Sequence, residues 1–168
     1  MASLRSVSSV QAFETLVARL DYPIFIATTV ADGDPFGCVV GFATQASIHP
    51  ARFLVCISEK NRTYRALQGA GAMAVHVVPP DGRALVELFG SETGDEVDKF
   101  ARCAWHEGPE GLPLLEACSS WFSGRILERH PLGDHVGHLV EPFAAEAGED
   151  DGFFPFSEAK DLEPGHEA

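Results

Sequence analysis

Residues 22–42, which read YPIFIATTV-ADGDP-FGCVVGF, decide the fold class. The run over residues 22–30 is rich in β-branched and aromatic residues, which favour strands. The run over residues 36–42 has the same character. Between them, Asp32-Gly33 supplies the residues that a tight hairpin turn needs. The sequence therefore predicts two antiparallel strands joined by a short turn.

Further strand-sized apolar runs follow the hairpin, and few helical stretches separate them. The expected strands cover residues 52–58 (buried on both faces), 73–78, 119–129 and 135–143, and the expected helices cover residues 10–20, 61–68 and two short stretches within 83–104. Strands with hairpin-sized gaps are typical of an antiparallel barrel rather than of a doubly wound sheet. We predict a mainly β protein, a β-barrel with helical decorations. Its domain spans residues 10–147, followed by an acidic and then aromatic C-terminal tail over 148–168.

The charge balance excludes two classes of partner. Among 168 residues, 12 Lys and Arg stand against 25 Asp and Glu, which gives a formal net charge of −13. Such a chain repels the phosphates of nucleic acids and of acidic lipid surfaces, so neither is an expected partner. No apolar stretch reaches the about 20 residues that a membrane helix needs, and no apolar leader follows Met1. We therefore expect a cytoplasmic protein.

Some motifs that suggest a cofactor or a metal lack the context they need. Residues 69–74 satisfy G-x-G-x-x-A, but a dinucleotide fingerprint follows a strand and opens a helix, and here the order is reversed. His135 and His138 are expected on opposite faces of one strand, because strand side chains alternate. His76 is expected to have a packing role. No metal site is expected, and the four widely spaced cysteines are expected to be structural thiols: Cys38, Cys56, Cys103 and Cys118.

The stretch over residues 37–65 is the candidate binding segment. Small and polar residues between two strands leave backbone N–H groups free to approach a planar, acceptor-rich ligand. Lys60, Arg62 and Arg65 form a local cationic patch near a helix start, where a phosphate would be stabilised. The same residues are also compatible with an ordinary strand, loop and strand followed by a solvated helix start. Spacing alone does not decide between the two.

The ordered motifs of this stretch resemble the flavin reductase-like family, the FMN-binding split barrel. Thr44, Gln45, Ala46, Ser47 and Pro50 match the family's Thr/Ser-containing turn, and Lys60, Asn61 and Thr63 match its phosphate segment; weaker matches follow at residues 85–89, 99–100, 111–115 and 133–135. Three positions depart from the family pattern: Val39, Gln45 and Ala51.

The resemblance implies an antiparallel Greek-key split barrel that uses NADH or NADPH to reduce FMN or FAD. It implies that residues 44–47 lie along the isoalloxazine ring and the ribityl chain. It further implies a phosphate site formed by Lys60, Asn61, Thr63 and Tyr64, and a contact between His135 and the nicotinamide or the reduced flavin. The resemblance also implies a homodimer, and a flavin-dependent monooxygenase as partner.

Alternatives remain open from the sequence. The protein could be a flavin-binding electron carrier or sensor without reductase activity of its own. It could also be a different redox enzyme on the same barrel, such as an oxidase or a deazaflavin-dependent reductase. Residues 133–135 could be no more than a turn into the last strand. The aromatic tail is expected to pack over the site or over a neighbouring subunit.

Overall fold

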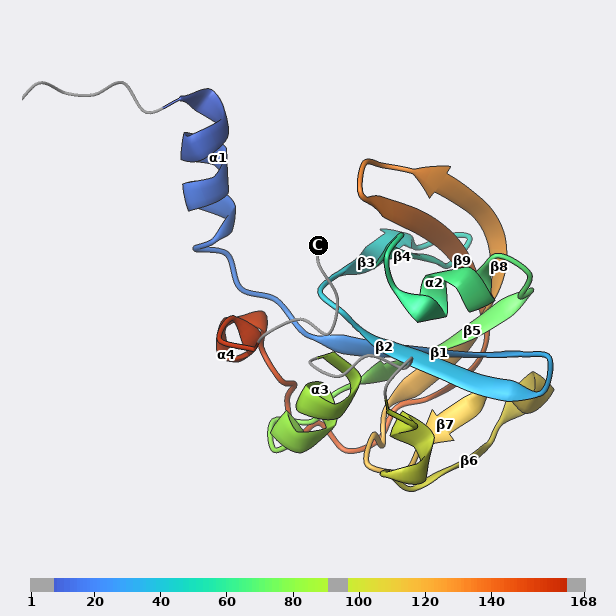
Figure 1. The fold of residues 1–168 in the computed structure, drawn as a ribbon. Helices are drawn as coiled ribbons and strands as arrows, with labels where there is room; N and C mark the ends of the chain where they lie inside the picture. The colour runs from blue at the N-terminus through green and yellow to red at the C-terminus, as the bar shows by residue number, and fades with distance from the viewer. Residues whose placement is uncertain (1–7, 91–96, 163–168) are drawn as a thin grey trace, which may run out of the picture.

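A curled antiparallel sheet of seven strands forms the body of the protein, in the order β2-β1-β5-β8-β9-β4-β3 (Figure 1). The computed structural model describes residues 8–90 and 97–162. The strands are β1 Phe25–Ala31, β2 Asp34–Val40, β3 Phe42–Ser47, β4 Arg52–Ser58, β5 Ala72–Val77, β8 Trp121–Pro131 and β9 His135–Glu146, with a separate pair of β6 Trp105–Glu107 and β7 Pro113–Leu115. The helices are α1 Ser9–Val17, α2 Arg62–Leu67, α3 Arg83–Gly90 and α4 Phe156–Ala159, with 3-10 turns at Lys99–Ala101 and Pro109–Gly111. The prediction of a mainly β fold is confirmed.

The hairpin over residues 22–42 forms as predicted. Strands β1 and β2 pair from Phe25↔Val40 to Ala31↔Asp34. Both turn residues have positive φ, 53° at Asp32 and 82° at Gly33, which matches the right-handed twist of the strands. One boundary was wrong: β2 ends at Val40, and residues 42–47 form the separate strand β3. A Cβ on Gly41, at the junction, would lie 3.4 Å from the Phe156 ring.

Two further predictions need correction. In β4 only Val55 and Ile57 are buried, because alternate side chains face the outside of the curled sheet, so the strand is not buried on both faces. Of the two short helices expected within residues 83–104, α3 is present, while the second is only the 3-10 turn Lys99–Ala101. The part over residues 91–96 lies outside the described residues. The β6–β7 pair, which flanks the 3-10 turn Pro109–Gly111, was not predicted.

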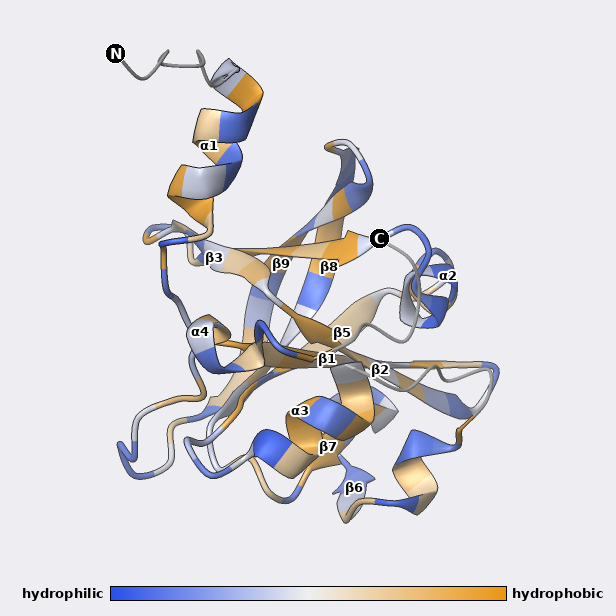
Figure 2. Cartoon of the chain, turned by 60° about the vertical axis from the view of Figure 1, so that its left-hand side comes forward, coloured by the Kyte–Doolittle hydropathy of each residue, from blue (hydrophilic) through white to orange (hydrophobic). Residues whose placement is uncertain are grey.

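Two hydrophobic clusters stabilise the fold. One lies inside the curled sheet and is covered by α2 through Leu67, and its central members include Val55, Met73, Val75 and Val140. The other lies on the opposite side, where α3 and the C-terminal segment pack against the hairpin, and its central members include Ile24, Val86, Phe89 and Phe154. Figure 2 shows the hydrophobic positions along α3 and the strands it faces.

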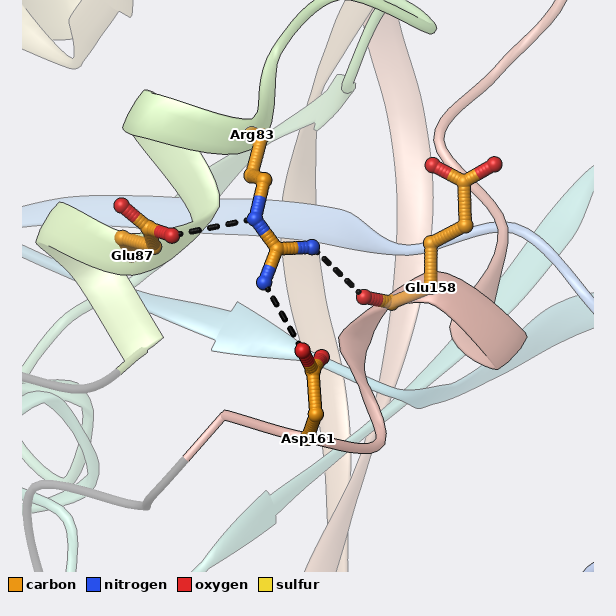
Figure 3. Close-up of polar contacts among 4 residues, drawn as sticks. All are labelled: Arg83, Glu87, Glu158 and Asp161. Atoms are coloured by element: carbon orange, nitrogen blue, oxygen red, sulfur yellow. Dashed lines mark hydrogen bonds and ion pairs between the residues drawn. The ribbon is translucent and has the colours of Figure 1, made fainter.

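The C-terminal tail packs on its own chain. The Phe154 N–H donates to the Val78 carbonyl (2.8 Å), and the Phe154 carbonyl accepts from the Ile24 N–H (2.9 Å). The Phe156 ring stacks on Tyr22 with 4.7 Å between centroids. Arg83 of α3 binds the turn that follows Phe156. Its guanidinium donates to the Glu158 carbonyl (3.0 Å) and pairs with the Asp161 carboxylate (3.1 Å), and the Glu87 carboxylate pairs with the same guanidinium (Figure 3). The described part of the tail is therefore built into the second cluster and α3.

Helix α1 begins as predicted, with a capping box between Ser8 and Gln11. None of its residues is buried, and the helix stands off the sheet (Figure 1). Its large apolar side chains are instead exposed, together with Leu20 just after it: Val10, Phe13, Leu16 and Leu20. The helix thus presents an apolar face that the described part of the chain leaves exposed.

His76 has the packing role that the sequence predicts. It is fully buried in β5, with Nδ1 2.9 Å from the Ile26 carbonyl and Nε2 3.1 Å from the Leu115 N–H. The carbonyl needs a donor and the N–H needs an acceptor, so the ring is the neutral tautomer with its proton on Nδ1. Burial lowers the pKa of His76 to about 4, against a smaller opposing effect of the Ile26 hydrogen bond.

We expect His76 to make the protein less stable in acid. In the unfolded chain the imidazole has its ordinary pKa of 6.5, so below that pH the unfolded state binds more protons than the folded state. The stability present above pH 6.5 is then lost as the pH falls towards the folded pKa. Between pH 7 and pH 5, urea unfolding should show a loss about 2 kcal/mol larger for the wild type than for His76→Gln, which does not titrate. Equal losses would contradict this, as would an imidazole NMR titration of folded His76 with a midpoint near 6.5.

Candidate functional site

Strand β3 carries the segment that was predicted to follow the flavin ring. Residues 44–47 were expected in a turn, and this was wrong: they belong to β3, at the edge of the sheet. Within the described residues β3 pairs only with β4, so its outer backbone groups face away from the sheet. Gln45 pairs with Phe53, the register shifts between Gln45 and Ser47, and the Gln45 Nε2 donates to the Ser47 carbonyl (3.4 Å). An edge with open backbone donors can accept a planar ligand.

His135 lies at the end of the sheet where β3 begins. It opens β9 and pairs with Ser58 of β4, and its ring centroid lies 5.1 Å from that of Phe42 in β3. Its side chain is 25% exposed, and its Nδ1 lies 2.7 Å from the Asp134 carboxylate. This hydrogen bond lowers the pKa of Asp134, with the charge of His135 adding to the effect. Asp134 thus stays ionised at neutral pH and orients the imidazole.

The predicted phosphate segment adjoins His135. The Glu59 N–H donates to the Asp134 carbonyl (3.1 Å), which ties the turn before α2 to the start of β9. Lys60 is exposed in this turn. Asn61 caps α2, with its Oδ1 accepting from the Thr63 N–H at 2.8 Å. Lys60 therefore lies, with an exposed side chain, at the same end of β4 as His135.

Thr63 and Tyr64 face inward instead. Thr63 is 2% exposed, and its hydroxyl makes a hydrogen bond with the Cys38 thiol, whose pKa burial raises to about 11. The Tyr64 hydroxyl accepts from Gln68 Nε2 (2.9 Å), and its ring approaches buried His138 with 6.5 Å between centroids. Of the four residues predicted for the phosphate, Lys60 is exposed, Asn61 and Tyr64 are half-buried, and Thr63 is buried.

The predicted residues therefore gather at one edge of the sheet, but not at one point. His135, Lys60 and Asn61 share one end of β4, whereas Ser47 pairs with Arg52 at the other end. An extended ligand along β3 would reach both. The exposed Phe42 ring beside His135 was missed by sequence reasoning, although an aromatic residue in an otherwise small and polar strand was the available signal.

Among the described histidines and cysteines outside the predicted site, His76, His138, Cys38 and Cys118 are buried. Two lie near the β3 edge: Cys56 pairs with Phe42, and His49 is exposed in the turn between β3 and β4. His138 is buried and His135 is partly exposed, which confirms that they occupy opposite faces of β9. His130 is exposed and lies 3.0 Å from the Glu128 carboxylate. The cysteines Cys38, Cys56, Cys103 and Cys118 are free. In residues 8–90 and 97–162 no three His, Cys, Asp or Glu side chains gather in a way that could hold a metal ion.

The G-x-G-x-x-A motif over residues 69–74 has the structural context that the sequence predicts. Helix α2 ends at Leu67 and β5 begins at Ala72, so the motif over residues 69–74 joins a helix to a strand, as the sequence indicates. No helix among the described residues is long and apolar enough to cross a membrane.

The described strands form a small antiparallel half-barrel whose two edge strands are β2 and β3, and comparison identifies its class. The domain model described as "Flavin reductase like domain" matches residues 17–156. The chain belongs to the flavin reductase-like family, as its sequence motifs predict.

Individual relatives agree with this assignment. The HsaB reductase subunit of a flavin-dependent monooxygenase from Rhodococcus jostii is 31% identical over 127 residues, which cover 73% of this chain and 62% of HsaB. The FMN reductase (NADH) RutF from Ancylobacter novellus is 28% identical over 88% of this chain and 81% of its own. The matched part of this chain covers less than two thirds of the length of HsaB. In structure, the NADH:FAD oxidoreductase SgcE6 from Streptomyces globisporus matches 87% of this chain and 86% of its own, with a TM-score of 0.79 and 22% identity, which confirms the predicted fold.

Proposed function

We propose that this protein is an NAD(P)H-dependent flavin reductase, which transfers a hydride from NADH or NADPH to FMN or FAD. The observation that carries the proposal is the edge formed by β3, His135 and Lys60, in a chain of the flavin reductase-like family. The names of RutF and HsaB agree with it, and HsaB's name supports a flavin-dependent monooxygenase as the consumer of the reduced flavin.

The donor chemistry of this edge fits a flavin. The open backbone of residues 44–47 offers hydrogen bonds to the carbonyls and nitrogens of an isoalloxazine ring, and the Gln45 amide adds a donor. Lys60 offers a positive charge for the phosphate. A bound flavin would supply the hydride-accepting chemistry. The task of the protein is then alignment, with His135, oriented by Asp134, against the nicotinamide or the ring.

The test is NADH and NADPH oxidation by the purified protein, with FMN, FAD or riboflavin added and with none. We expect turnover that depends on added flavin. His135→Ala should lower kcat/KM about tenfold, since a lost positioning contact of about 1.4 kcal/mol has that effect. His130→Ala, which removes an exposed imidazole elsewhere, should stay within about twofold. Tight flavin binding without turnover would instead favour an electron carrier or sensor.

A homodimer belongs to the same proposal. Four large apolar side chains are exposed along α1 and just after it, and the edge strand β3 pairs only with β4 among the described residues. A second copy of the chain would cover such apolar surface. Light scattering of the same preparation should give twice the chain mass of 18.1 kDa, and a monomer would contradict the proposal. A cytoplasmic location, where NAD(P)H is at hand, is compatible with the free cysteines.

A further inference from the structure

A pocket lies between α2 and the tip of the β1–β2 hairpin. Its volume is about 480 Å³. Arg62 and Arg65 contribute to its lining from α2, and Asp32, Asp34 and Phe36 from the hairpin. Such a volume is within the range of small-ligand sites, roughly 300–1,000 Å³. The function proposed above places neither the flavin ring nor the flavin phosphate in this pocket.

The lining combines three kinds of group: guanidinium groups, carboxylates and an aromatic ring. Two guanidinium groups, one helical turn apart, provide donors for a phosphate. Two carboxylates provide acceptors for hydroxyl or amino groups. Phe36 provides an aromatic face, and the Arg62 guanidinium already lies 5.0 Å from its centroid. A matching ligand needs a phosphate, hydroxyl or amino donors, and a flat ring.

The position of the pocket narrows the choice. Arg62 follows Lys60 by two residues, so the pocket begins where the proposed phosphate segment ends. FMN ends at its phosphate, whereas FAD continues from that phosphate into adenosine monophosphate. The inference about the pocket rests on the proposed function, in which Lys60 binds the flavin phosphate.

We propose that this pocket binds the adenosine-phosphate moiety of a dinucleotide. Arg65 and Arg62 bind the phosphate, Asp32 and Asp34 accept from the ribose hydroxyls or the adenine amino group, and Phe36 contacts the base. FAD and NAD(P)H both carry this moiety, and experiment can distinguish them. If the source is FAD, the pocket makes the protein prefer FAD over FMN.

Arg65→Gln is the test variant, because it removes one guanidinium from an exposed helix position and keeps a polar side chain. Arg125→Gln is the matched control, since Arg125 is an exposed arginine over another aromatic ring, Phe143, away from the pocket. We expect Arg65→Gln to raise the Kd for FAD about tenfold and to leave that for FMN within about twofold. Binding of 5′-AMP, measured by calorimetry, should weaken in parallel. The control should change none of these values.

Each outcome points in one direction. If the KM for NADH or NADPH rises about tenfold while the preference for FAD stays the same, the pocket binds the nicotinamide dinucleotide. If 5′-AMP, FAD and NAD(P)H all bind Arg65→Gln as they bind the wild type, the inference is overturned. A wild type that binds 5′-AMP through Arg65 but neither binds nor reduces any flavin would leave the pocket in place and overturn the proposed function.

Discussion

Phe154→Ala is expected to lower the free energy of unfolding by about 3–5 kcal/mol, the range for truncating a buried phenylalanine. The Phe154 side chain is 1% exposed and packs with Ile24, Val78 and Phe89. The substitution leaves the backbone hydrogen bonds of residue 154 in place, so the loss reports the side chain's packing and the cavity left behind. Urea unfolding followed by fluorescence measures the change.

Phe153→Ala is the control, because the same residue type stands one position earlier and is 46% exposed. We expect it to cost less than about 1 kcal/mol, since nearly half of its surface is already in water. Similar losses for the two variants would contradict the packing role of Phe154. They would place the aromatic tail outside the core.

The tail shows where sequence reasoning reached its limit. Phe153, Phe154 and Phe156 stand close together without helical or alternating periodicity. The sequence therefore indicated that they pack against a surface, but not which surface they cover. The structure gives them different environments: Phe154 is buried, Phe156 stacks on Tyr22, and Phe153 is largely exposed. Those environments depend on residues far earlier in the chain, namely Tyr22, Ile24 and Val78, and no local pattern encodes such contacts.

Strong local signals predicted most of the strands. The Asp32-Gly33 turn and the β-branched runs fixed the hairpin, and the Pro79-Pro80 pair marks the end of β5. Strand β3 was missed because Thr44, Gln45, Ala46 and Ser47 are small or polar. An edge strand tolerates such residues, since it has one neighbour and an exposed surface. Pairing with β4, rather than propensity, makes it a strand.

The candidate site was predictable as a set of motifs but not as a geometry. Strand order decides that Ser58 pairs with His135, and strand order cannot be read from periodicity. Thr63 matches a phosphate motif in sequence, yet helix α2 turns its hydroxyl toward the Cys38 thiol inside the protein. In the proposed function, the positive charge for the phosphate comes from Lys60, which is exposed in the turn before α2.

Lys60→Ala is expected to raise the Kd for FMN roughly 10- to 100-fold, the effect of losing a charge-assisted hydrogen bond worth about 1.5–3 kcal/mol. Lys60 is exposed in the turn tied to Asp134, and its charge adds to the lowering of the Asp134 pKa. Riboflavin has the same ring and ribityl chain but no phosphate. Its Kd should stay within about twofold, as fluorescence titration of both flavins can measure.

Lys160→Ala is the matched control, because it changes the net charge by the same amount at a site where the ammonium donates to the Ala18 carbonyl and lies over Phe156. If both lysine variants weaken FMN equally, the effect is the general field of a more negative protein, and the Lys60 contact is refuted. Equal weakening of FMN and riboflavin by Lys60→Ala would place the phosphate elsewhere. A loss specific to Lys60 and to FMN fixes the phosphate at the turn before α2, with the flavin ring left to lie along the edge of β3.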